Sequence, residues 1–140
     1  MKFPSDVQFL EEVRLLIFRP HGTLDEDSLN KIVDVIGELE AFSKEPFNRF
    51  WDATNYAKVN LNFRVAANVS LYRRLAYSDR PSIKSAILAI DRRIIHYGNL
   101  LAFLTRGSPI QMHVFQERSA AADWLAVPVE LLAPRSNGAS

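Results

Sequence analysis

The sequence of 140 residues contains no cysteine and only five glycines. The absence of cysteine excludes a disulfide scaffold, thiolate catalysis and cysteine-ligated zinc. The glycines form neither the GxGxxG pattern of dinucleotide-binding domains nor a phosphate loop, and neither HExxH nor GxSxG occurs. The three histidines, His21, His96 and His113, are not at metal-ligand spacing. We therefore expect no metal and no cofactor, and we expect a protein that is not an enzyme.

Long hydrophobic runs are also missing. The apolar runs at 86–90 and 100–104 are five residues long, far from the roughly 18 that a membrane helix needs. The first residues, with Lys2 and Asp6, lack the apolar core of a secretion signal, so we expect a cytoplasmic protein with no membrane span. Hydrophobic residues make up 48% and charged residues 24%, as in an ordinary globular domain. We expect this single domain to span residues 1–127, followed by a tail at 128–140.

Charge is divided unevenly along the chain, although the net charge is only +1. Residues 1–56 carry 11 acidic and 6 basic side chains, whereas residues 57–118 carry 3 acidic and 10 basic ones. The basic part could attract an anionic partner or the acidic part of a second copy, but its arginines also suit the solvated sides of two helices. Aromatic residues do not alternate with basic ones as a stacking surface requires, so we expect no nucleic-acid partner.

Hydrophobic periodicity predicts strands that alternate with helices. The predicted strands lie at 13–20, 47–52, 82–90 and 110–115. The predicted helices are one that begins at a capping box from Thr23 to Glu26, one at 59–77, one capped by Asp91, and one at 120–127. A short segment at 7–10 is expected to add an edge strand. This alternation predicts a single α/β domain with a mostly parallel sheet of four to five strands.

The predicted helix at 59–77 has two apolar strips, which is more than one sheet face can cover. The second strip could belong to the core and contact a second copy in a homodimer, which is the interpretation that we prefer. Alternatively, it could form the wall of a cavity for a small apolar or lipid-like ligand. On the last predicted helix, we expect Trp124 to be buried as an anchor of the core.

Several short motifs occur in an order that is typical of a known family. They are GTLD at 22–25, DAT at 52–54, YG at 97–98, HVF at 113–115 and AADWL at 121–125. The first two resemble the Gly-x-Leu-Asp turn and the Asp-x-Ser/Thr strand end of STAS domains, the sulfate-transporter and anti-sigma-antagonist fold. The other three resemble the SpoIIAA-like bacterial branch of that superfamily. The resemblance covers residues 7–127 and implies a STAS/SpoIIAA-like α/β fold with a non-enzymatic regulatory or protein-binding role.

The resemblance breaks at the start of the second helix. Antagonist STAS domains carry Asp-Ser-Ser-Gly there, and a partner kinase phosphorylates one of these serines. The corresponding residues of this chain are Asn60, Leu61, Asn62 and Phe63, which include no hydroxyl group. The resemblance therefore implies a module that lacks the phosphorylatable serine motif.

Five polar residues lie at or just after the ends of predicted strands: His21, Asp52, Thr54, Arg92 and Arg93. The carboxyl ends of parallel strands open on one edge of a sheet, where side chains from separate loops converge. Helix N-termini and the two arginines favour an anion at this edge, whereas Asp52 opposes one. We therefore expect these five residues to bind a polar group of a partner protein. In the alternative interpretation, Asp52 and Thr54 only cap the second helix and its loop.

Three functions remain open. The leading hypothesis is a regulatory or protein-binding module that forms a homodimer and binds a regulatory protein. The second is a carrier of a small apolar or lipid-like ligand, and the third is an uncharacterised enzyme that uses His21 and Asp52. In native mass spectrometry, a retained small molecule would favour the carrier and an empty dimer would favour the module.

Overall fold

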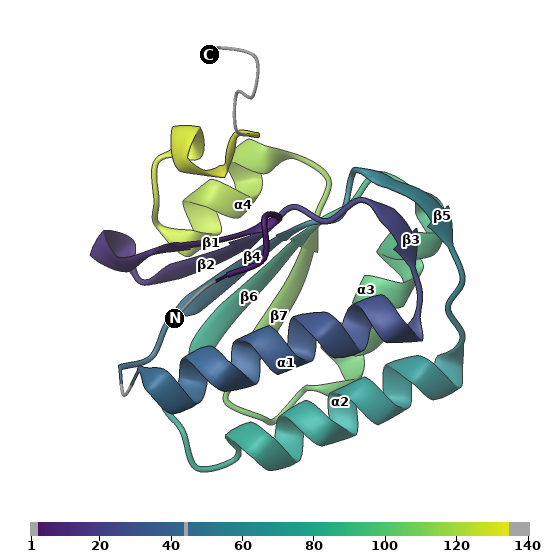
Figure 1. The fold of residues 1–140 in the computed structure, drawn as a ribbon, viewed down its shortest axis with the longest axis horizontal. Helices are drawn as coiled ribbons and strands as arrows, with labels where there is room; N and C mark the ends of the chain where they lie inside the picture. The colour runs from purple at the N-terminus through teal and green to yellow at the C-terminus, as the bar shows by residue number, and fades with distance from the viewer. Residues whose placement is uncertain (1–2, 44, 135–140) are drawn as a thin grey trace.

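The computed structural model describes residues 3–43 and 45–134. Within them, a five-stranded sheet in the order β1-β2-β4-β6-β7 forms the middle layer (Figure 1). Its strands are β1 (Val7–Leu10), β2 (Leu15–Phe18), β4 (Asn48–Asp52), β6 (Ile83–Leu88) and β7 (Ile110–Phe115). β1 pairs with β2 in antiparallel orientation, and the other three pairings are parallel. The predicted mostly parallel α/β sheet is confirmed, including its short edge strand at 7–10.

Helices lie on both sides of this sheet (Figure 1). One side holds α1 (Glu26–Phe42), α2 (Phe63–Tyr77) and α3 (Arg92–Leu104). The other side holds α4 (Arg118–Leu125) and the short 3-10 helix η2 (Val129–Leu132). A further 3-10 turn, η1 (Glu11–Val13), joins β1 to β2. A mostly parallel sheet between two helical layers is the arrangement that alternating strands and helices favour.

A second, two-stranded sheet joins the loops that leave β2 and β4. It pairs β3 (Gly22–Leu24) with β5 (Tyr56–Val59) in parallel orientation. The backbone N–H of Asn60 extends the pairing by donating to the carbonyl oxygen of Leu24 at 2.8 Å, and the Leu24 side chain is fully buried. This small sheet therefore holds together the two segments that lead into α1 and α2.

Residues that alternate along each strand supply a separate core on each side of the sheet. In β2, Leu16 and Phe18 belong to the core between the sheet and the layer of α1, α2 and α3. Leu15 and Ile17 belong to the core beneath α4 and η2. All four side chains of β2 are buried, as expected for a strand covered on both faces.

The capping box of α1 differs from the predicted one. Asp25 and Ser28 form it: the Ser28 backbone N–H donates to Asp25 Oδ1 at 2.9 Å, and the Asp25 backbone N–H donates to Ser28 Oγ at 3.0 Å. Thr23 lies in β3 instead, so the prediction of a box from Thr23 to Glu26 was wrong. Thr23 is paired with β5, and the local sequence carries no signal for that distant partner.

The second helix also begins later than its predicted start at residue 59. Val59 ends β5, and α2 begins at Phe63 with Asn62 as its N-cap. Asn62 Oδ1 accepts a hydrogen bond from the Val65 backbone N–H at 3.0 Å. Residues 60–63 therefore lead into the second helix, at the place that the resemblance implied, and an asparagine stands there in place of a serine.

The packed structure extends past residue 127, where we expected the domain to end. Leu132 of η2 is fully buried in the core beneath α4. The Arg19 guanidinium donates to the carbonyl oxygens of Leu131 and Ala133 at 3.2 and 2.7 Å, which ties this segment to the end of β2. A single buried leucine produces no periodic pattern, so the sequence did not reveal it. Residues 135–140 of the expected tail lie outside the described residues.

Trp124 is half-buried, which corrects its expected role as a core anchor. Its ring centroid lies 5.1 Å from that of His113 and 5.5 Å from that of Phe115, at the β7 edge of the sheet. The neighbouring Leu125 is only 4% exposed. Leu125 is therefore the residue that anchors α4 in the core, and Trp124 covers the edge of that core.

Candidate functional site

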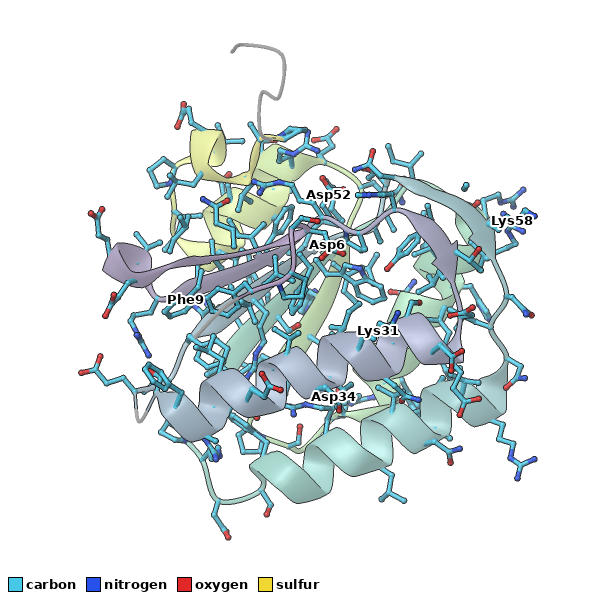
Figure 2. All side chains as sticks on the ribbon, viewed as in Figure 1. Asp6, Phe9, Lys31, Asp34, Asp52 and Lys58 are labelled. Carbon is cyan, nitrogen blue, oxygen red and sulfur yellow. The ribbon has the colours of Figure 1, made fainter. Side chains whose placement is uncertain are left out.

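Asp52, one of the five predicted site residues, is fully buried at the end of β4. Its Oδ1 accepts hydrogen bonds from the Thr54 backbone N–H at 3.1 Å and from Thr54 Oγ1 at 2.6 Å. Its Oδ2 lies 3.2 Å from Arg118 Nη2 at the start of α4 (Figure 2 shows Asp52 at this edge). Asp52 and Thr54 therefore hold the loop after β4, as in the alternative interpretation, but the N-cap of α2 is Asn62, and Asp52 contacts α4 instead.

The other three predicted residues are exposed. Arg93 is bound to the N-cap of its own helix, with Nη2 at 2.9 Å from Asp91 Oδ2. Hydrogen bonds from Arg93 hold the pKa of the Asp91 carboxyl down at about 2. Along the described part of the chain, no hydrogen bond or ion pair links His21, Arg92 or Arg93 to Asp52. The structure thus does not gather the five residues into one bonded cluster.

A cavity of about 80 Å³ lies between the sheet and the layer of α1, α2 and α3. Apolar side chains form most of its wall: Phe18, Trp51, Ile87, Leu29, Ile32, Val33, Ile36, Val69, Leu101, Ile110 and Met112. The polar side chains along its wall are Arg49, Arg73 and Ser85. We call this space the inner cavity. A cavity needs only about 10–15 Å³ to hold one water molecule, so the inner cavity has room for a small molecule.

The two arginines of the inner cavity share one carboxylate. Arg49 Nη2 from β4 and Arg73 Nη2 from α2 lie 2.5 and 2.6 Å from the same oxygen, Glu40 Oε2 on α1. The exposed fractions of the three side chains are only 4%, 8% and 5% for Arg49, Arg73 and Glu40. Two buried cations therefore face one buried anion, and this group, the arginine pair with Glu40, carries a net charge of +1.

The charge of Arg49 is only partly compensated. Burial lowers the pKa of the Arg49 guanidinium to about 10, although the nearby Glu40 carboxylate acts in the opposite direction. Arg49 Nε is buried and has no hydrogen-bond partner among the described residues. The ring faces of Phe47 and Tyr77 approach the guanidinium carbon at 4.7 and 5.2 Å, which offsets part of the cost of burial. At neutral pH Arg49 remains a cation with a spare donor.

A second space adjoins the inner cavity. This outer pocket measures about 210 Å³ and shares Phe18 and Ile32 with the inner cavity. Its other lining residues are Val7, Val35 and Tyr56, with Pro4, Asp6, Pro20, His21, Ser28 and Lys31. Figure 2 shows two of these lining residues, Asp6 beside the strands and Lys31 on α1. Of the five predicted site residues, His21 lines the outer pocket, which shares two lining residues with the inner cavity.

One hydrogen bond links the walls of the two spaces. Trp51, which lines the inner cavity, donates from Nε1 to the hydroxyl oxygen of Tyr56 in the outer pocket at 3.1 Å. The two rings meet edge to face, with centroids 6.3 Å apart. Because Tyr56 begins β5, this contact makes the small β3–β5 sheet part of the boundary of the site.

The sequence contained one usable signal for this site, and it was missed. Arg49 lies inside a strand whose next three residues are buried. A charged residue inside a buried strand requires a buried partner. Glu40 and Arg73, however, were indistinguishable from the many charged residues on the outer sides of their helices.

Comparison with known proteins identifies the architecture. No family model matches the chain, and no curated protein matches it. A crystal structure matches with a TM-score of 0.54 and 19% sequence identity, over 85% of this chain and 90% of the other. It is that of an uncharacterized protein of the DUF3478 family with a SpoIIAA-like fold, from Shewanella loihica PV-4. The fold of our chain is SpoIIAA-like. The resemblance stated from the motifs is confirmed at the level of the fold.

Two further kinds of feature are absent from residues 3–43 and 45–134. None of the helices there combines the length and the apolar character that crossing a membrane requires. No three or more His, Asp or Glu side chains of these residues are grouped so that they could hold a metal ion.

Proposed function

We propose that the protein is a non-enzymatic binding module that carries a small, mainly apolar molecule in its inner cavity. The observation that carries this proposal is the cavity itself, whose wall is apolar except for Arg49, Arg73 and Ser85. Apolar cavities in proteins bind small apolar molecules, because water finds few partners along an apolar wall. This choice corresponds to the second of the three hypotheses made from the sequence.

The outer pocket supplies room for a ligand longer than the inner cavity can hold. Phe18 and Ile32 line both spaces, and a ligand that extends from one to the other must displace these two side chains. A chain-like molecule could therefore place one end in the inner cavity and the other toward Asp6, His21 and Lys31 at the outer pocket. Such a division between an apolar interior and a few polar groups is typical of small-molecule sites.

Native mass spectrometry of freshly purified protein tests this proposal. We expect a retained small molecule on the wild-type chain, and its loss when Val33→Phe fills part of the inner cavity. Val129→Phe, on η2, is the matched control, because Val129 is 39% exposed and does not line the cavity. A wild-type protein that is empty and also fails to take up added hexan-1-ol would contradict the proposal. Retention of the ligand by a folded Val33→Phe variant would place the site elsewhere.

The arrangement of Asp52 favours binding over catalysis. An enzyme built on His21 and Asp52 needs a carboxylate that can reach a substrate. Asp52 is instead fully buried and bonded to Thr54 and Arg118. We therefore retain the proposal that the protein is not an enzyme.

A regulatory or protein-binding role in the cytoplasm, with a homodimer, is our second proposal. Leu71 on α2 and Phe103 on α3 are 59% and 62% exposed, and these two helices pack against each other. A contact between two copies would cover these two exposed side chains, as apolar patches are covered at contact surfaces. Light scattering at high micromolar concentration, in low and moderate salt, should show a dimer that the double variant Leu71→Lys, Phe103→Lys converts to a monomer. A wild-type monomer under both conditions would contradict the homodimer.

A further inference from the structure

The buried charges beside the inner cavity do not balance. Arg49 and Arg73 both pair with the single oxygen Oε2 of Glu40. Each guanidinium has five N–H donors in a planar fork. One carboxylate oxygen satisfies only a fraction of them, and Arg49 Nε has no partner among the described residues. Burying a cation without a full partner is costly, so this site favours one more anion.

The position of these charges makes a ligand the natural source of that anion. Arg49 and Arg73 both line the inner cavity, together with the hydroxyl of Ser85 and apolar side chains. A ligand that enters the cavity therefore meets two guanidinium groups within an otherwise apolar wall. Burial lowers the pKa of Arg49 to about 10, and a second carboxylate beside it would act in the opposite direction, as Glu40 does.

We propose that the ligand of the inner cavity is an aliphatic monocarboxylate, whose carboxylate pairs with Arg49 and Arg73 while its chain lies against the apolar wall. This inference rests on the proposed function. One carboxylate neutralises the net charge of +1 on the arginine pair with Glu40, whereas a phosphate dianion would overcompensate it. Guanidinium groups also match the two oxygens of a carboxylate geometrically.

A structural role for the three charges is the competing explanation. The group joins α1, β4 and α2 through Glu40, Arg49 and Arg73, and it could serve only to hold these elements together. That explanation predicts no preference between a carboxylate and an uncharged molecule of the same length. The two explanations can therefore be separated by comparing two matched ligands.

The experiment measures binding of hexanoate and of hexan-1-ol by Trp51 fluorescence. A Trp124→Phe background leaves Trp51, in the cavity wall, as the remaining tryptophan of the chain. We expect hexanoate to bind about tenfold or more tightly than hexan-1-ol, because hydrogen bonds to charged groups strengthen binding by that order. Equal binding of the two ligands would overturn the carboxylate inference and leave the proposed function intact. Binding of neither ligand would overturn the proposed function itself.

The variant that tests the arginine pair is Arg73→Met. Removing the Arg73 guanidinium leaves Glu40 and Arg49 as a neutral buried pair, so the charges in the variant still balance. We expect the advantage of hexanoate over hexan-1-ol to disappear in Arg73→Met, and to persist in Arg73→Lys, which keeps the positive charge. Arg106→Met is the matched control, since Arg106 is exposed on the segment after α3. An unchanged preference in a folded Arg73→Met variant would overturn the inference. If Arg73→Met does not fold, the carboxylate inference is tested by comparing the binding of hexanoate and hexan-1-ol to the wild-type protein.

Discussion

Arg118 at the start of α4 forms an ion pair with Asp52 at the end of β4, with 3.2 Å between Nη2 and Oδ2. The carboxylate of Asp52 is fully buried, whereas the Arg118 side chain is 31% exposed. This contact joins the sheet to a helix 66 residues further along the chain. Asp52, which the sequence analysis predicted to be a binding residue, is therefore already paired within the fold.

Replacing Asp52 should therefore destabilise the protein. We expect Asp52→Ala to lower the free energy of unfolding by about 3 kcal/mol, because it removes a buried carboxylate and leaves Arg118 without its partner. Thr54→Val, which removes only the hydroxyl that donates to Asp52, should cost about 1 kcal/mol. Urea unfolding of the two variants measures both values. A stability of Asp52→Ala equal to that of the wild type would show that the ion pair contributes nothing to folding.

Arg92 provides the cleaner test of partner binding at this edge of the sheet. Arg92 is exposed, so Arg92→Ala should leave stability within about 0.5 kcal/mol of the wild type. A loss of partners in pull-downs with Arg92→Ala would support a protein-binding role of this edge. The same partners recovered by both proteins would place the protein contact on another surface, such as the one around Leu71 and Phe103.

Replacing each of two helical glycines with alanine should change the stability of the protein in opposite directions. A Cβ at Gly98 of α3 would lie 2.7 Å from Val114 Cγ2 and 3.4 Å from Ile87 Cδ1, whereas a Cβ at Gly37 of α1 meets nothing within 4 Å. We expect Gly98→Ala to cost about 1–3 kcal/mol through overpacking against β7. Gly37→Ala should stabilise by up to about 1 kcal/mol through helix propensity. Thermal unfolding measures both, and a stabilised Gly98→Ala variant would contradict the close packing of α3 on the sheet.

Asp91 should titrate at unusually low pH. Hydrogen bonds from Arg93 lower its pKa from 3.8 to about 2. Because the pKa is lower in the folded chain, the Asp91 carboxylate favours the folded state above pH 4, and this contribution is lost as the pH falls toward 2. Carbon-detected NMR titration should return the pKa of Asp91 toward its ordinary value in Arg93→Ala and not in Arg92→Ala. An ordinary pKa in the wild type would show that the pair with Arg93 does not persist in solution.

Shortening the side chains of Leu125 and Trp124 to alanine should distinguish the roles of these two neighbours at the end of α4. Leu125→Ala should lower the free energy of unfolding by about 3 kcal/mol, as for a leucine that is 4% exposed. Trp124→Ala should cost about 2 kcal/mol, because part of its ring already contacts solvent next to His113 and Phe115. Chemical denaturation measures the two values. A larger loss for Trp124→Ala than for Leu125→Ala would restore Trp124 as the anchor of the helix.

The fold could be predicted from the sequence because its signals are local. Strand β6 is a run of mainly apolar residues, and α3 has an N-cap at Asp91 and a glycine with positive φ, Gly107, after its end. The pairing of β3 with β5 could not be predicted in this way. This pairing depends on contacts between segments that are more than 30 residues apart. Because of it, α1 and α2 begin later than the sequence predicted.

The candidate site could not be predicted because its parts are distant in the sequence and individually ordinary. Glu40 and Arg73 are 33 residues apart, and each lies on a helix among other charged residues. Their meeting with Arg49 depends on how α1 and α2 pack beneath β4. The predicted residues at the strand ends followed a general rule for parallel sheets, whereas in this chain Asp52 and Thr54 are bonded within the fold.

The central claim is that a ligand occupies the inner cavity, and intermolecular NOEs test it most directly. The measurement uses protein labelled at its methyl groups and aromatic rings, with saturating hexanoate. We predict NOEs from the hexanoate chain to the methyl groups of Ile87 and Leu101 and to the Trp51 indole, all of which line the cavity. NOEs confined to exposed side chains such as Leu71 or Phe103, or none to the cavity wall, would contradict the account.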